Sequence, residues 1–384
     1  MKASILAVGT EITNGQIVNK NAAWISAQLN ALGLKVTMHV TVPDDRPLIL
    51  DALALAEKQS DLIFVTGGLG PTSDDFTRDL VSQWSQRKLV YHEESWQHIV
   101  KRLGSRGFQA GQIQKQQCYF PEGADVLINP EGTANGFTFS LVREAGSASP
   151  TSASAPSKKV FVLPGPPREI EAIWNLHIQS WMQENTRHVD KVITRAWDTI
   201  GVGESDVASK VEEVFADRPT GIFLELGYRV HLPYVEVKVS FFEKDLALWQ
   251  SWLAKMDALL GEITIAKDFV DLADSISKKT QSIDFAFYDY VSGGYLQHRL
   301  SPFLKSHAKY SWKQSDDKPL VELFQHEENF LALLPLEDDK ALLLFDYMGR
   351  RKQMVIEAPM KAVTLGERRK QYMAEMALAY FSQI

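Results

Sequence analysis

The segment from residue 67 to residue 77 contains residue types that could bind a phosphate group. It reads Gly-Gly-Leu-Gly-Pro-Thr-Ser-Asp-Asp-Phe-Thr. Glycines after a strand let backbone N–H groups face an anion, and a following helix adds the positive end of its dipole. Asp74 and Asp75 place two carboxylates beside that anion, and a cation between them would remove the repulsion. We therefore predict a phosphate site that holds a metal ion; the alternative is that one aspartate only caps a helix.

Two other loops contain residues that could belong to the same site. In the first, Gly9 allows a ligand to approach the backbone, and Glu11 supplies a third carboxylate. The other is the segment 129–136, Asn-Pro-Glu-Gly-Thr-Ala-Asn-Gly, with Pro164 and Gly165 after a later strand. Ordinary turn formation explains these loops equally well, so both interpretations stay open.

The elements before these loops predict how they are positioned. Strand-like and helix-like segments alternate in the order Ala3–Val8, Asn21–Leu32, Lys35–Val42, Asp45–Gln59 and Asp61–Thr66, and Asn21 is expected to cap the first of the two helices. This β-α-β-α-β pattern is typical of a parallel sheet with helices on both faces, so we predict an α/β fold. In such sheets ligands bind beyond the carboxyl ends of the strands, where all of these loops would lie.

Composition limits the class of protein. The 384 residues carry a formal net charge of −7, which argues against an extended nucleic-acid surface but not against a small phosphate ligand. The single cysteine excludes an internal disulfide and a cysteine-rich zinc site. The start of the chain lacks the pattern of a signal peptide, and no apolar run is long enough to span a bilayer. We expect a cytoplasmic protein that does not bind membranes or nucleic acid.

The length predicts two or three domains. We place a doubly covered parallel-sheet domain at 1–170, a small α+β module at 171–264 and a further α/β domain at 265–384. Residues 166–185 are expected to form a helix that leaves the first domain. The low-complexity segment Gly146–Ser157 is expected to be a mobile hairpin tip, because both of its flanks resemble strands of one sheet.

Several motifs resemble the CinA (competence/damage-inducible) family over residues 1–170. They are Ala-Val-Gly-Thr-Glu at 7–11 with Asn14 and Asn19, Gly-Gly-Leu-Gly-Pro-Thr-x-Asp-Asp-x-Thr at 67–77, Asn-Pro-Glu-Gly-Thr-Ala at 129–134 and Leu-Pro-Gly-Pro-Pro-Arg-Glu at 163–169. The same domain resembles the molybdopterin-binding MogA/MoaB proteins. Ile-Gly-Val-Gly-Glu-Ser at 200–205 is similar to the KH-like middle module of CinA proteins, which we interpret as a structural spacer.

The last domain departs from the family pattern. CinA proteins often end in an amidohydrolase that acts on nicotinamide mononucleotide, with a serine nucleophile in an Ala-Glu-Ser-Cys-Thr-Gly-Gly motif. In this chain Tyr290 stands at the serine position, and Ser292 stands at that of the threonine. A phenol cannot replace a short activated hydroxyl in that geometry, so we predict that this domain is inactive.

The resemblance implies that the first domain hydrolyses a nucleoside diphosphate sugar, ADP-ribose, to AMP and ribose 5-phosphate. It also implies a divalent ion, cobalt or magnesium, and potassium. We assign Asp74, Asp75 and Glu11 as catalytic and metal-binding residues. The predicted substrate-binding residues are Gly9, Thr10, Asn14, Asn19, Gly67, Gly68, Leu69, Gly70, Pro71, Thr72, Thr77, Asn129, Glu131, Gly132, Thr133, Pro164 and Gly165.

Two other functions fit the same sequence. One is a protein that binds a phosphorylated pterin without catalysis, and the other is a scaffold whose units only assemble. Apolar faces on the two later units predict a homodimer.

Overall fold

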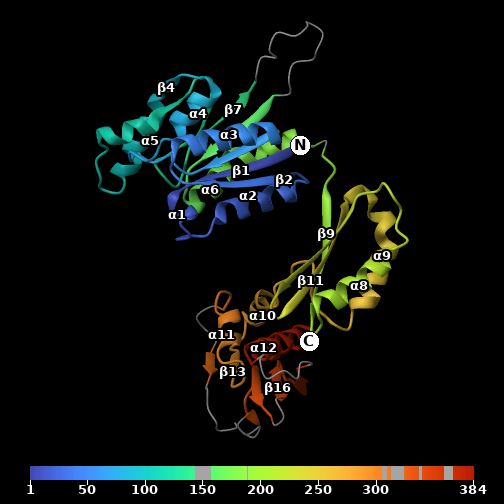
Figure 1. The fold of residues 1–384 in the computed structure, drawn as a ribbon. Helices are drawn as coiled ribbons and strands as arrows, with labels where there is room; N and C mark the ends of the chain where they lie inside the picture. The colour runs from blue at the N-terminus through green and yellow to red at the C-terminus, as the bar shows by residue number, and fades with distance from the viewer. Residues whose placement is uncertain (143–156, 188, 305–308, 313–323, 337–339, 359–365) are drawn as a thin grey trace. The chain divides into compact units, whose positions relative to one another are not determined.

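The structure is a computed structural model and describes residues 1–142, 157–187, 189–304, 309–312, 324–336, 340–358 and 366–384. The chain folds into two compact units, Met1–Val192 and Ile193–Ile384 (Figure 1). The first unit thus continues past residue 170, where we expected a boundary. The second unit contains both later modules, and their division at residue 264 stays a prediction. No helix within the described ranges is long and apolar enough to cross a membrane.

The first unit is built on a six-stranded sheet with the order β2-β1-β3-β8-β7-β6. Its strands are β1 (Lys2–Val8), β2 (Lys35–Val42), β3 (Leu62–Thr66), β6 (Asp125–Leu127), β7 (Gly136–Leu141) and β8 (Lys158–Leu163). The pairs β1–β2, β1–β3 and β3–β8 are parallel, whereas β7 and β6 continue the sheet antiparallel. The predicted α/β fold with a mainly parallel sheet is confirmed.

Helices cover both faces of this sheet. They are α1 (Thr10–Thr13), α2 (Lys20–Ala31), α3 (Arg46–Gln59), α4 (Thr77–Ser85), α5 (Glu93–Gly104), α6 (Pro167–Ile173) and α7 (Gln179–Asn185), with a π-turn η2 (Trp174–Ile178) between the last two. Side chains of α3 and α4 pack in the core on one face. Side chains of α2 and of the α6–α7 segment pack in the core on the other. A 3-10 segment η1 (Gln112–Cys118) and a two-stranded ribbon, β4 (Leu89–Tyr91) with β5 (Tyr119–Pro121), complete the unit.

Two local expectations turn out differently, and a third concerns the low-complexity segment. Asn19, not Asn21, caps α2, because its side chain accepts a hydrogen bond from the N–H of Ala22. The helical segment that we expected to leave the first domain instead buries Ile173 and Met182 against the first sheet. The strands flanking the low-complexity segment are paired antiparallel as expected. Residues 146–156 of that segment lie outside the described ranges.

The second unit contains two sheets. The first has the order β10-β11-β9-β12 and comprises β9 (Val192–Ile200), β10 (Leu224–His231), β11 (Tyr234–Phe242) and β12 (Thr264–Lys267). Its helices are α8 (Glu204–Val214) and α9 (Leu246–Leu260), with a short 3-10 turn η3 (Glu243–Asp245) before α9. Side chains of α8, α9, β9 and β11 share one core, which gives this part the expected α+β character.

The other sheet of this unit has the order β14-β13-β15-β16-β17. Its strands are β13 (Ala286–Asp289), β14 (Lys309–Trp312), β15 (Phe330–Pro335), β16 (Lys340–Tyr347) and β17 (Arg350–Glu357). The helices α10 (Leu272–Thr280), α11 (Tyr295–Leu300) and α12 (Gly366–Ser382) pack on it through a shared core.

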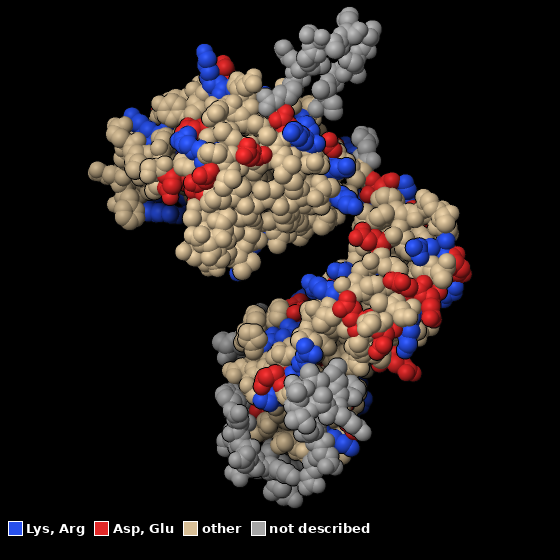
Figure 2. Space-filling model, in the orientation of Figure 1, with Lys and Arg blue, Asp and Glu red and all other residues tan. Residues whose placement is uncertain are grey.

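Charged side chains of both signs are interspersed on the molecular face shown in Figure 2. On that face, lysines and arginines of each unit stand next to aspartates and glutamates rather than gathering in a basic stripe. A basic stripe is the usual mark of a surface that follows a nucleic-acid backbone. The charge distribution in view therefore gives no support to such a role.

Candidate functional site

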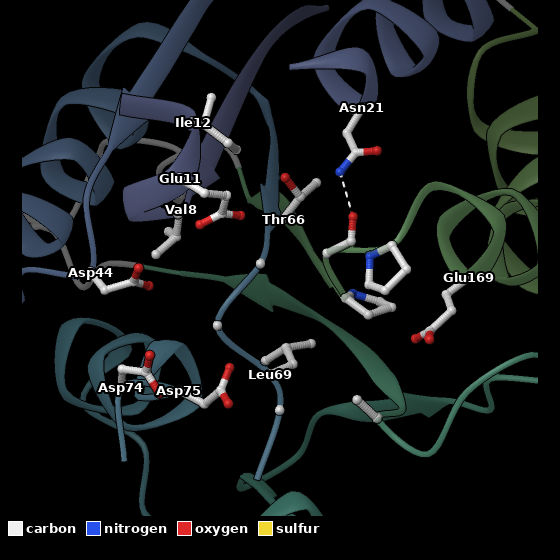
Figure 3. Close-up of a pocket in the computed structure, with 18 of the residues that line it drawn as sticks. Val8, Glu11, Ile12, Asn21, Asp44, Thr66, Leu69, Asp74, Asp75 and Glu169 are labelled. Carbon is white, nitrogen blue, oxygen red and sulfur yellow. Dashed lines mark hydrogen bonds between the residues drawn. The ribbon is translucent and has the colours of Figure 1, made fainter. Parts of the chain in front are cut away.

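A cleft of about 530 Å³ opens at the carboxyl ends of β1 and β3 (Figure 3). In the sheet, β1 lies between β2 and β3. The chain runs from β1 to β2 on one side of β1, and then crosses to β3 on its other side. Such a switch point leaves a crevice that α/β proteins use for ligands. The register aligns Ala7 with Thr66 and Thr66 with Leu163, which brings the loops after β1, β3 and β8 to one edge.

Two glycines allow the loop after β3 to turn sharply into the cleft. Gly67 has φ +96°, and a Cβ atom there would lie 2.1 Å from the carbonyl oxygen of Val8. Gly68 has φ +65°, and its Cβ would lie 2.1 Å from Oγ1 of Thr77. Any other residue would be strained by its backbone conformation and would also collide with its neighbours. These glycines therefore set the close contact between this loop, the end of β1 and the start of α4.

Three carbonyl groups of this loop, those of Gly68, Leu69 and Gly70, accept hydrogen bonds from the protein. The Gly68 oxygen accepts from the N–H of Thr77 at 3.2 Å. The Leu69 oxygen accepts from Nη1 of Arg78 at 2.7 Å and from Nε2 of Gln117 at 3.3 Å. The Gly70 oxygen accepts from Nη2 of Arg78 at 3.1 Å. Side chains from α4 and η1 therefore fix the orientation of the Leu69 and Gly70 carbonyls, and the backbone of α4 fixes that of Gly68.

The amide groups of the same loop remain available. Within the described ranges, no acceptor receives a hydrogen bond from the N–H of Gly68, Leu69 or Gly70. All three residues line the cleft. Consecutive N–H groups without acceptors form a positively polarised surface that binds anions. This row of amides is the strongest indication of a ligand in the first unit.

A buried arginine lies behind these amides. Arg78 is only 3% exposed, and its burial lowers the pKa of the guanidinium to about 10. The side chain therefore stays charged at neutral pH. Because a full positive charge in a region of low dielectric acts over a longer range than one in water, it adds to the attraction for an anion in front of the loop.

Asp75 and Asp74 follow the loop and line the cleft (Figure 3). Asp75 accepts hydrogen bonds from the N–H of Thr72 at 2.9 Å and from the Thr72 hydroxyl. Its carboxylate also covers Gly70, where a Cβ would lie 2.4 Å from Oδ2. The Thr72 hydroxyl, which also reaches Asp74, and a backbone N–H lower the pKa of the exposed Asp74. Asp75 is thus held in place, while Asp74 is charged and more exposed to solvent.

Two further carboxylates reach the cleft from the β1 side (Figure 3). Glu11, a predicted site residue, lies over Gly9, where a Cβ would be 2.8 Å from Oε1. Asp44 was not predicted. It accepts hydrogen bonds from the N–H of Thr10 at 2.9 Å and from the Thr10 hydroxyl at 2.8 Å. The signal that could have revealed Asp44 is its place directly after β2, at the same sheet edge as the other loops.

The carboxylates suit a divalent cation that is completed by its ligand. Within the described ranges, no three histidine, cysteine, aspartate or glutamate side chains converge as a ready-made metal site. Magnesium, however, is commonly bound by one or two carboxylates together with substrate phosphates and water. Asp74 and Asp75 beside the free amides match that requirement. The third expected ligand, Glu11, lines the same cleft from the other side.

The opposite wall of the cleft comes from α2 and from the loop after β8. Nδ2 of Asn21 donates to the carbonyl oxygen of Gly165 at 2.7 Å, the contact drawn in Figure 3. Glu169, from α6, also lines this wall and accepts a hydrogen bond from Nδ2 of Asn129 at 2.7 Å. Burial raises the pKa of Glu169, although Asn129 and Arg102 act against that change. Neither Asn21 nor Glu169 was among the predicted site residues.

The predicted site residues fall into two groups. Those that line the cleft are Gly9, Glu11, Gly67, Gly68, Leu69, Gly70, Pro71, Asp74, Asp75, Thr133, Pro164 and Gly165. Those that do not line it are Thr10, Asn14, Asn19, Thr72, Thr77, Asn129, Glu131 and Gly132. Several of the second group instead support the first.

The supporting roles are visible in individual hydrogen bonds. Thr10 and Thr72 hold Asp44 and Asp75. Asn129 is fully buried, and its Oδ1 accepts from the N–H groups of Glu131 and Gly132 at 2.9 Å. Direct contact of any of these residues with a ligand stays a prediction.

The loop at the amidohydrolase-like position of the second unit is closed by its own hydrogen bonds. Oδ1 of Asp289 accepts from the N–H of Val291 at 3.1 Å and of Ser292 at 2.8 Å, and Oδ2 accepts from the Ser292 hydroxyl. Ser292 is buried, and Tyr290 packs against a cluster that includes Phe324 and Phe330. The Ser292 hydroxyl is thus engaged by Asp289, and the inactivity of this domain stays a prediction.

Comparison with known proteins gives a family match within the first unit and relatives that match beyond it. A domain family described as "Probable molybdopterin binding domain" matches residues 4–184. A competence-damage inducible protein of Caldicellulosiruptor saccharolyticus is 33% identical over 270 residues, which cover 68% of this chain and 60% of that protein. One from Clostridium botulinum (strain Loch Maree / Type A3) is 30% identical over 306 residues, which cover 79% of this chain and 71% of the relative.

One solved structure is similar in sequence to part of this chain. The CinA protein of Thermoplasma acidophilum, whose function is given as unknown, is 32% identical, and the match covers 47% of this chain and 96% of that one, with a TM-score of 0.40. The similarity to the C. botulinum protein extends over most of both chains. With its motifs placed around one cleft, the chain belongs to the CinA family of competence-damage inducible proteins.

Proposed function

We propose that the first unit hydrolyses the diphosphate bond of a nucleoside diphosphate sugar, with ADP-ribose giving AMP and ribose 5-phosphate. The observation that carries this proposal is the row of three free amides at Gly68, Leu69 and Gly70, flanked by carboxylates. Amides without acceptors suit the oxygens of a diphosphate, and carboxylates suit the cation that accompanies it. The cleft volume of about 530 Å³ lies within the usual range for small-ligand sites.

The carboxylates and the amides of the cleft have different roles in this reaction. Asp74 and Asp75, with Glu11 on the other side, would hold a divalent ion such as Mg²⁺ or Co²⁺. When bound, such an ion polarises a phosphoryl oxygen and makes a bound water more acidic. The loop amides stabilise negative charge as it grows on the phosphoryl oxygens, and their fixed orientation means that they need not reorganise.

A carboxylate of the cleft accepts the proton of the attacking water. The candidates are Glu11, Asp44, Asp74 and Asp75. Asp44 and Asp75 are each held by a threonine, so they are better suited to a fixed position than the exposed Asp74. To accept the proton, the carboxylate must lie within hydrogen-bond reach of the water. Mutation of each carboxylate in turn separates the proton acceptor from the residues that only hold the metal ion.

A second candidate is a protein that binds a phosphorylated pterin without hydrolysing it. It is favoured by the match of residues 4–184 to the family described as a probable molybdopterin-binding domain. The loop amides would serve a pterin phosphate equally well, because the anion-binding requirement is the same.

Incubation of the purified full chain with ADP-ribose separates the two candidates. We expect AMP release with Mg²⁺ or Co²⁺, and the assay should be run with and without K⁺. Asp75→Asn should abolish turnover, whereas Asp206→Asn, on α8 of the second unit, is the matched control and should retain it. Binding of ADP-ribose without AMP release, together with tight binding of a pterin phosphate, would support the second candidate instead.

A further inference from the structure

Two side-chain amides in the walls of the cleft each have an oxygen atom without a donor. Gln117, from η1, is 1% exposed and lines the cleft beside Leu69. Asn21, at the start of α2, lines the opposite wall beside Gly165. The Oε1 atom of Gln117 and the Oδ1 atom of Asn21 are both buried, and neither has a hydrogen-bond partner within the described ranges.

The orientation of both amides is fixed by a neighbouring carbonyl group. Nε2 of Gln117 donates to the Leu69 carbonyl at 3.3 Å, and Nδ2 of Asn21 donates to the Gly165 carbonyl at 2.7 Å. Turning either amide over would place two oxygens together and lose the hydrogen bond. The atom left without a partner is therefore an acceptor in each case.

A buried acceptor without a donor is unfavourable, so such groups are usually paired. The missing partner must be an N–H or O–H group. A diphosphate at neutral pH offers oxygens that accept hydrogen bonds, and these would be repelled by Oε1 and Oδ1. In a ligand such as ADP-ribose, whose diphosphate is fully ionised at neutral pH, the sugar hydroxyls and the amino group of the organic part can supply such donors.

We propose that Gln117, with Asn21 opposite, is a specificity residue that recognises hydrogen-bond donors on the organic part of a phosphorylated ligand. This inference rests on the proposed function, because it assumes that the diphosphate occupies the free amides of Gly68–Gly70. The amide surface and the two acceptors then orient the ligand: phosphate oxygens face the loop, and donor groups face Gln117 and Asn21. The cleft thereby distinguishes a nucleotide from inorganic pyrophosphate.

Binding of two ligands to matched variants tests this inference. We would titrate the full chain by calorimetry with ADP-ribose and with inorganic pyrophosphate. Gln117→Met removes the acceptor and the Nε2 donor at nearly constant length, and pyrophosphate binding reports separately on the loss of the donor to the Leu69 carbonyl. Gln116→Met is the control, because the neighbouring Gln116 is exposed and donates to the Thr72 carbonyl at 3.2 Å.

We expect Gln117→Met to weaken ADP-ribose binding by about tenfold, the size of one lost hydrogen bond in a buried site, and to change pyrophosphate binding by less than about twofold. Gln116→Met should stay close to the wild type for both ligands. An equal loss for both ligands in Gln117→Met would overturn the inference, since Gln117 would then only support the Leu69 carbonyl. Failure of the wild type to bind either ligand would overturn the proposed function itself and this inference with it.

Ligand analogues test the same idea in the wild-type protein without any substitution. ADP is compared with 2′-deoxy-ADP, which lacks a ribose hydroxyl, and with inosine 5′-diphosphate, which lacks the amino group of the base. Weaker binding of one analogue by about fivefold or more supports the inference and identifies the donor. Equal affinity for all three would contradict it.

Discussion

A methyl group added at Gly68 should reveal how closely the loop and α4 are packed. Its Cβ would lie 2.1 Å from Oγ1 and 3.1 Å from Cβ of Thr77, and the residue has φ +65°. Placing alanine in the left-handed region costs about 1–2 kcal/mol. Relieving the collision costs about 1–3 kcal/mol more, as in other overpacked sites. We therefore expect Gly68→Ala to lower the free energy of unfolding of the first unit by about 2–5 kcal/mol.

The substitution Thr77→Ala separates these two contributions. The Thr77 hydroxyl has no hydrogen-bond partner within the described ranges, so its loss leaves no group unpaired, and the variant alone should cost about 1 kcal/mol. In this background the collision with Oγ1 is absent. Gly68→Ala should then cost only about the 1–2 kcal/mol of its backbone conformation.

Differential scanning calorimetry of the full chain measures both values. For a unit of about this size, 1 kcal/mol shifts the melting temperature by about 2–4 °C. Gly68→Ala should therefore lower one transition by about 4–20 °C in the wild-type background and by about 2–8 °C in the Thr77→Ala background. The same loss in both backgrounds would refute the reasoning, because the collision with Thr77 would then contribute nothing.

Three other predictions follow from the contacts described. Arg78→Met should weaken pyrophosphate binding by about tenfold or more, because two loop carbonyls lose their donors. Arg78→Lys should weaken this binding less. An unchanged affinity of Arg78→Met, measured by calorimetry, would contradict the prediction. Burial raises the pKa of Glu169 in the folded protein. The stability that its neutral carboxyl group contributes is therefore present at pH values below the ordinary pKa of about 4.3, and it is lost as the pH rises through the raised pKa. Glu169→Gln should accordingly gain stability relative to the wild type between pH 4 and pH 8 in urea unfolding, and a constant difference would argue against it. Tyr290→Ser should still release no ammonia from nicotinamide mononucleotide, because Asp289 and Ser292 close that loop; ammonia in a coupled assay would disprove it.

The sheet and the loop after β3 could be predicted because local signals agree there. Alternating apolar segments indicated the parallel strands, and the glycines after a fully buried strand indicated a close backbone contact. The position of Asp75 beside that loop followed from adjacency in the chain. The residues Asp74 and Asp75 thus reached the cleft as expected, as did Glu11 after β1.

The other walls of the cleft depend on contacts between distant parts of the chain. Gln117 is 48 residues from Leu69, and Asn21 is 144 residues from Gly165. Nothing in the residues around Gln117 distinguishes it from its neighbour Gln116 before the fold is known. Asn21 was interpreted as a helix cap, which Asn19 provides instead, because both asparagines suit that position. Asp44 was overlooked because an Asp-Asp pair before a helix looks like simple capping.

The packing of residues 173–182 shows a similar limit. Apolar residues on one face of a helix predict burial but not the partner that provides it. Ile173 and Met182 could have covered either of two sheets, and only the tertiary structure assigns them to the first. The edge strand β17 was not predicted for a related reason. Its exposed residues Arg350, Arg351 and Lys352 lack the alternation that marks a half-buried strand.

The side-chain anchors on the carbonyls of Leu69 and Gly70 imply that this segment is rigid before any ligand arrives. Most of its conformational entropy is lost during folding, so association should require little rearrangement. Free and ligand-bound crystals should therefore superimpose over this segment. Mutations that loosen the anchors should act on affinity through disorder in the free protein, visible as lower NMR order parameters of the backbone at positions 68–70 even when no ligand is present.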